Sequence, residues 1–127
     1  MSPDKWLDLK DLRMTHEGRW ESSVRLGPSS EWFSGHFDEY PLVPGVALLA
    51  LAAETVKRQG RRQKRLLEVS GFSVVRFRRL VFPSEQLLIS VDAMPPGSEA
   101  KLDFHVTCRG HTVVYGVLKA TEELPSG

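Results

Sequence analysis

The feature that most constrains the fold is an unbroken apolar run, residues 46–53, inside a segment with helix signals at both ends. Pro44 suits the first turn of a helix, because its missing N–H would have had no partner there. Lys57 and Arg58 suit the last turn, where the helix dipole favours cations, and Gly60 is typical of a helix C-terminus. The segment therefore predicts a helix over residues 44–59 that stops at Gly60.

This predicted helix is apolar on every side through its first two turns, whereas a surface helix has a single apolar stripe. It must therefore be buried, and a chain of 127 residues has to wrap it. Its alanines allow a sheet to approach closely. At about 24 Å the helix is also too short, and too charged at its end, to span a membrane.

The rest of the chain has the pattern of strands separated by turns. Apolar alternation marks residues 19–26, 66–80, 87–93, 101–109 and 111–121. Consecutive strands joined by short turns form an antiparallel meander. Residues 1–18 are predicted to form either an N-terminal arm or a short helix, and residues 122–127 a loose tail.

The same alternation predicts which side chains share a face. Within 66–80, it places Val69, Gly71, Ser73, Val75 and Phe77 together. In the later strands it predicts an exposed His105 and a buried Cys108, and it places His111 in an exposed hairpin.

The order of these elements predicts an α+β fold in a single domain, residues 1–127. A helix that is apolar all round, beside a sheet of about five strands, implies that the sheet curls round the helix. One edge of such a sheet would stay unpaired. We therefore expect a dimer in which the sheet continues from one subunit to the next.

Composition narrows the possible partners. The formal net charge is +1, and no aromatic residues interleave with the basic cluster, so no nucleic-acid partner is expected. The single cysteine rules out an internal disulfide, and the N-terminus lacks the apolar core of a signal peptide. A cytoplasmic location follows as the expectation. No ligand spacing suggests a metal, and no Gly-rich loop suggests a phosphate cofactor.

Two motifs carry a family resemblance. Gly35-His36-Phe37, followed by Pro41-Leu42-Val43-Pro44-Gly45-Val46, resembles the G-H-F-P-x-x-P-(V/I)-x-P-G-V motif of the bacterial 3-hydroxyacyl-ACP dehydratases, and the spacing matches without a gap. Residues 74–83, VVRFRRLVFP, are similar to the V-K-F-R-K-P-V-x-P-G segment of that family. The similarity covers residues 19–121.

The resemblance implies a hot-dog fold, a dimer with acyl tunnels at the subunit interface, and His36 as the catalytic base. It also implies that the backbone N–H of Gly45, beside Val46, binds the thioester carbonyl. Both roles are chemically sound. Imidazole accepts a proton near neutral pH, and a free N–H at a helix N-terminus stabilises the oxyanion formed when the proton beside a thioester leaves.

The sequence departs from the family at the second catalytic group. Family members carry Glu or Asp on the helix, fourteen residues after the histidine, where this chain has Ala50. Glu54 lies one turn further on and leans back over Ala50, so it is a candidate general acid. The alternative is an ion pair with Arg58 at i+4 or Lys57 at i+3. The family proline after the histidine is replaced by Asp38.

A basic cluster is the last candidate site. It would dock an acidic acyl carrier protein or the phosphates of coenzyme A, or else be a solvated loop and a polar strand face. The docking candidates are Arg58, Arg61, Arg62, Arg76, Arg78 and Arg79.

Three functions remain open at this stage. The first is dehydration of a (3R)-3-hydroxyacyl thioester of acyl carrier protein, or less favoured of coenzyme A. The second is a non-catalytic module that binds acyl thioesters or a carrier protein, which Ala50 favours. The third is a thioesterase on the same fold.

Overall fold

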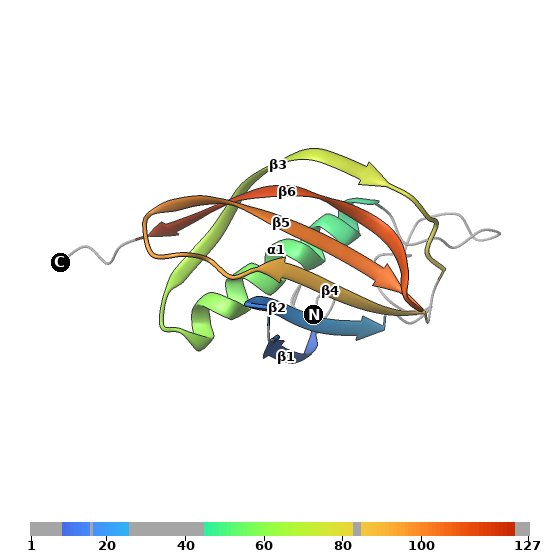
Figure 1. The fold of residues 1–127 in the computed structure, drawn as a ribbon, viewed down its shortest axis with the longest axis horizontal. Helices are drawn as coiled ribbons and strands as arrows, with labels where there is room; N and C mark the ends of the chain where they lie inside the picture. Colours follow the sequence, from blue (N-terminus) through green and yellow to red (C-terminus); the bar gives the residue numbers. More distant parts are fainter. Residues whose placement is uncertain (1–8, 16, 26–44, 83–84, 124–127) are drawn as a thin grey trace, which may run out of the picture.

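One curved antiparallel sheet and one long helix make up the part of the chain that the computed structural model describes, residues 9–15, 17–25, 45–82 and 85–123. Figure 1 shows the helix lying along one face of the sheet. The sheet has six strands in the order β1-β2-β4-β5-β6-β3. The elements are β1 (Lys10–Met14), β2 (Arg19–Arg25), α1 (Gly45–Arg62), β3 (Leu66–Phe77), β4 (Gln86–Asp92), β5 (Glu99–Cys108) and β6 (His111–Glu123).

The predicted α+β class is confirmed, with one strand more than the sequence indicated. The additional strand is β1, which pairs antiparallel with β2. The sequence left this segment open between an arm and a short helix, and over Lys10–Met14 the chain is extended. The sheet does not close on itself, so β1 and β3 form its two edges.

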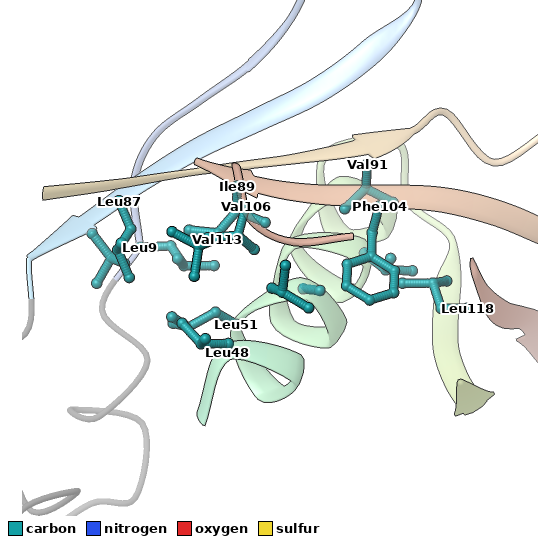
Figure 2. Close-up of a cluster of buried hydrophobic side chains, with 14 of the residues drawn as sticks. Leu9, Leu48, Leu51, Leu87, Ile89, Val91, Phe104, Val106, Val113 and Leu118 are labelled. Atoms are coloured by element: carbon teal, nitrogen blue, oxygen red, sulfur yellow. The ribbon is translucent and has the colours of Figure 1, made fainter. Parts of the chain in front are cut away.

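The core lies between α1 and the inner face of the sheet. In Figure 2, side chains of β4, β5 and β6 point toward Leu48 and Leu51 of α1. Leu51, Ala52 and Val56 of the helix are completely buried. The predicted alternation is confirmed in these central strands, whose inward residues are Leu87, Ile89, Val91, Leu102, Phe104, Val106 and Cys108.

The helix is not buried on every side, and that prediction was wrong. Val46 is 65% exposed, and Leu49, Ala50 and Ala53 are only half-buried. These four positions follow the i, i+3, i+4, i+7 spacing of a single helix face. The reason is geometric, because an open sheet covers one side of a helix and leaves this outer apolar stripe uncovered. Within the described residues, no helix has the length and apolar character needed to cross a membrane.

The end of α1 also differs from the prediction. The helix continues past Gly60 to Arg62, and a Schellman motif ends it. The N–H of Arg65 donates to the Gly60 carbonyl at 2.8 Å, and the N–H of Lys64 donates to the Arg61 carbonyl at 3.2 Å. The residue in the left-handed conformation is Lys64, with φ of 57°.

Gly60 is therefore required by close packing and not by its own φ. A Cβ atom at Gly60 would lie 2.6 Å from the carbonyl oxygen of Arg65 and 2.8 Å from Cγ of Leu67. The chain turns back tightly over this helical position as it enters β3.

Replacing Lys64 with glycine is expected to stabilise the protein by about 0.5–1 kcal/mol, because glycine adopts positive φ without the steric cost of a Cβ. Lys64 is exposed, so its side chain contributes little packing. Urea denaturation of the wild type and of Lys64→Gly measures the difference. A decrease in the free energy of unfolding would contradict the Schellman assignment.

Two β-bulges in β3 decide which of its side chains face the core. The register between β3 and β6 gives their positions. The register shifts between Val69 and Gly71 and again between Ser73 and Arg76. Each shift adds one residue to β3, which reverses the alternation. Gly71 and Ser73 consequently lie on the outer face, contrary to the prediction, and Phe72 packs against the core.

Candidate functional site

The predicted base, His36, lies outside the described residues, together with Asp38 and Pro44. The structure therefore describes only the part of the candidate site that α1 contributes. That side begins at Gly45, the first residue of α1.

The first turn of α1 offers backbone amides beside an aromatic side chain. The first amides of any helix have no intrahelical acceptor and lie at the positive end of the dipole. Here the first turn holds no acidic residue that would cap them. Phe77, from the end of β3, packs against this turn. A Cβ atom at Gly45 would lie only 3.0 Å from Cε1 and 3.1 Å from Cζ of its ring.

Glu54 is engaged by arginines near the C-terminal end of the helix. Arg58 donates from Nε to its carboxylate at 3.2 Å, and Nη1 of Arg61 lies 3.7 Å away. The Glu54 side chain is 12% exposed. This is the i, i+4 ion pair with Arg58 that was the alternative to a role as general acid. Glu54 also lies roughly 14 Å along the helix axis from Gly45, too far for it to reach a group held at that end in the same subunit.

The basic residues do not form one cluster. Arg58, Arg61 and Arg62 lie in the last turns of α1, where they line a hollow of about 440 Å³ with Leu9, Asp11 and Leu12. Arg76, Arg78 and Arg79 are exposed at the end of β3, close to the helix N-terminus, because Phe77 lies among them. The two groups are separated by most of the length of α1, which is about 27 Å.

A second hollow, on the outer face of the sheet, was not anticipated from the sequence. It has a volume of about 460 Å³ and is lined in part by Arg19, His105 and Tyr115. Arg19 donates to Oγ of Ser90 at 2.7 Å and forms an ion pair with Asp92. These side chains meet because His105 pairs with Ser90 on one neighbouring strand and with Tyr115 on the other. The sequence pattern within any one strand does not predict this.

The other predicted positions are mostly as expected. His105 is half-buried, not exposed as predicted, and its Nε2 lies 3.0 Å from the Thr112 hydroxyl. Burial, with a smaller effect of the Arg19 charge, lowers the pKa of His105. His111 is exposed and Cys108 is buried, as predicted. Burial raises the pKa of the Cys108 thiol, which donates to Glu85 at 3.0 Å. Among the described residues no group of side chains is arranged to hold a metal ion.

Solved structures share this fold over almost the whole chain. The dehydratase heterocomplex ApeI:P from Xenorhabdus doucetiae aligns with a TM-score of 0.71 and 22% identity, covering 95% of this chain and 99% of that one. The PaaI protein of the E. coli phenylacetic acid degradation operon aligns with a TM-score of 0.70 and 17% identity, covering 93% and 86%. A hypothetical thioesterase from Streptococcus pneumoniae, solved with coenzyme A, aligns with a TM-score of 0.68 and 13% identity, covering 91% and 86%.

A curated relative has a more similar sequence. The 3-hydroxyacyl-[acyl-carrier-protein] dehydratase FabZ of Listeria welshimeri is 30% identical over 116 residues, which cover 86% of this chain and 81% of the relative. The FabZ of Chromobacterium violaceum is 36% identical over 69 residues, covering 50% of this chain and 46% of the relative.

The fold and these likenesses define a hot-dog protein of the dehydratase class, as the motifs in the sequence predicted. The sequence model of the ApeI-like family, described as ApeI dehydratase, matches residues 13–117. The chain belongs to the ApeI-like dehydratase family.

Proposed function

We propose that this protein eliminates water from a (3R)-3-hydroxyacyl thioester carried by acyl carrier protein, giving the 2-enoyl thioester. The observation that supports the proposal is that α1 begins at Gly45, near the end of the motif that carries His36, so Gly45 and Val46 belong to the first turn of a helix. Membership of the ApeI-like family and the FabZ relatives support the reaction class.

The proposed chemistry uses His36 and the first turn of α1. The neutral imidazole of His36 takes the proton from C2, while the amides of Gly45 and Val46 stabilise the charge that develops on the thioester oxygen. The electron pair of the C2–H bond forms the C2–C3 double bond, and the C3–O bond breaks. The protonated His36 then returns its proton to the departing hydroxyl, which leaves as water. In this scheme a carboxylate at position 50 is not required.

Glu54 is the alternative donor of that proton, and its ion pairs argue against the role. Replacing Glu54 with glutamine is expected to leave turnover within about threefold of wild type and to cost about 1–3 kcal/mol of stability, because the Glu54 side chain is only 12% exposed. Turnover of 3-hydroxyacyl-ACP and urea denaturation measure the two effects. A loss of a hundredfold or more in kcat would instead assign Glu54 as the acid, acting across a subunit interface.

The carrier is proposed to dock near the helix N-terminus. Arg76, Arg78 and Arg79 are exposed and flank Phe77 in the sequence, and Arg78 lies over the Tyr115 ring on the outer face of the sheet. An acidic carrier protein bound there would deliver its thioester over a short distance. Arg58, Arg61 and Arg62 lie at the other end of α1, so within one subunit they are the less suitable group.

We also propose a homodimer. The outer stripe of α1, formed by Val46, Leu49, Ala50 and Ala53, and the unpaired edge of β3 are surfaces that a second subunit would cover. Light scattering is expected to give twice the chain mass of 14.3 kDa. Because the relative from X. doucetiae is described as a heterocomplex, a monomer that becomes active only with a second hot-dog chain is the outcome that would replace this proposal.

Incubation with 3-hydroxyacyl-ACP tests the function directly. An enoyl-ACP product supports the dehydratase, and release of the free acid would indicate the thioesterase chemistry for which the fold also provides examples. Binding without turnover would indicate a non-catalytic module. Parallel incubations with the coenzyme A thioester decide between the two carriers.

A further inference from the structure

Phe77 packs against Gly45, the first residue of α1. The edge of its ring is so near Gly45 that a Cβ atom there would be 3.0 Å from Cε1. The residue is nevertheless 52% exposed. It therefore packs on the first helical turn with one side and leaves the other side open.

The two bulges of β3 together leave Phe77 on the face that uninterrupted alternation from Val69 gives it. Phe77 pairs with Val114, which is completely buried, so both lie on the inner face of the sheet. Each bulge reverses the alternation, and two reversals cancel. With only one bulge, Phe77 would point to the outer face, away from Gly45.

The second bulge is held at a steric cost. Val74 has a φ of 52°, a left-handed conformation that is unfavourable for a β-branched residue. Gly116 of β6 makes room for it, since a Cβ there would lie 3.0 Å from Cα of Val75 and 3.1 Å from the Val74 carbonyl oxygen. Bulges of this kind are over-represented beside functional sites, where they redirect a side chain.

We propose that Phe77 is a positioning residue for the reaction: its ring fixes the first turn of α1 and excludes water from one side of the amides that hold the thioester carbonyl. An amide that faces a hydrocarbon ring, and not water, makes a stronger hydrogen bond to a developing oxyanion. The inference rests on the proposed function, because it assigns Phe77 to the same carbonyl site.

The first test is kinetic. Phe77→Ala is expected to lower kcat for 3-hydroxyacyl-ACP by about 10- to 100-fold with little change in KM, because a displaced carbonyl site affects the transition state most. Phe77→Leu, which keeps an apolar side chain over the turn, is expected to restore most of the loss. Phe82→Ala is the matched control, since Phe82 is also 52% exposed, and it should retain wild-type kcat.

The second test does not depend on activity. Gly45→Ala is expected to lower the melting temperature in the wild type, where the new methyl group meets the ring, and to lower it much less in the Phe77→Ala background. Additive effects of the two substitutions would show that the ring does not press on Gly45 in solution, and this would overturn the inference.

The outcomes separate the two proposals. If the wild type is active and Phe77→Ala keeps its kcat, the positioning role is wrong and the proposed function stands. If the wild type makes no enoyl product from either carrier, the proposed function fails and the positioning role fails with it. If Phe77→Ala does not fold, Phe77→Leu and Gly45→Ala carry the test, and wild-type kcat in both would overturn it.

Discussion

Replacing His36 with alanine is expected to lower kcat/KM for 3-hydroxyacyl-ACP by about 10²- to 10⁴-fold, because the proposed reaction then lacks both its base and the acid that returns the proton. The loss should appear mainly in kcat, since imidazole does its work in the transition state. The initial rate of enoyl product formation measures the change in kcat/KM, and circular dichroism checks that the variant is folded.

His111→Ala is the matched control for this experiment. His111 is exposed in the hairpin between β5 and β6, and its removal should leave turnover unchanged. If His36→Ala retained more than about a tenth of the wild-type kcat/KM, that would be inconsistent with general-base catalysis by this residue. The carbonyl site at Gly45 would then have to act with a different base.

Replacing Gly60 with alanine is expected to lower the free energy of unfolding by about 3 kcal/mol, at the upper end of the range for overpacking. The new Cβ would lie 2.6 Å from the carbonyl oxygen of Arg65, which is backbone and cannot rotate away. Relief requires the turn from α1 into β3 to open. That movement would break the hydrogen bond from Arg65 N–H to the Gly60 carbonyl.

Gly71→Ala provides the comparison within the same part of the chain. No atom lies within 4 Å of a Cβ built at Gly71, so this variant should change stability by less than about 1 kcal/mol. Urea denaturation of both variants measures the contrast. Equal free energies of unfolding would mean that the close approach at Gly60 is absent in solution.

The central strands show how much of the fold local pattern determines. In β4 and β5 the alternation of apolar side chains predicted the buried face correctly from Leu87 to Cys108. β4 has regular partners on both sides, and the register shift beside β5 puts its extra residue in β6, so a period of two is preserved in both strands. In β3 the same rule misplaced Gly71 and Ser73, because the bulge between Val69 and Gly71 reverses the alternation until a second bulge, beside Gly116, restores it.

In the candidate site, too, short-range sequence patterns predicted some contacts and missed others. Pro44 indicated the start of α1, and the spacing of Glu54 and Arg58 allowed their ion pair, because both signals lie within a few residues. The contact of Phe77 with Gly45 joins segments that are distant in the sequence. Alternation alone gave the face on which Phe77 lies, but the contact itself depends on where the sheet passes over the start of α1.

By itself, the sequence determined the long helix, the antiparallel strands that follow it and the histidine-to-glycine motif that identifies the family, because these depend on neighbouring residues. Only the tertiary structure decided which face of α1 is uncovered, why Gly60 must be a glycine, and that the basic residues form two separate groups. Those features depend on where an open sheet passes over the helix, and the positions that meet there are far apart along the chain.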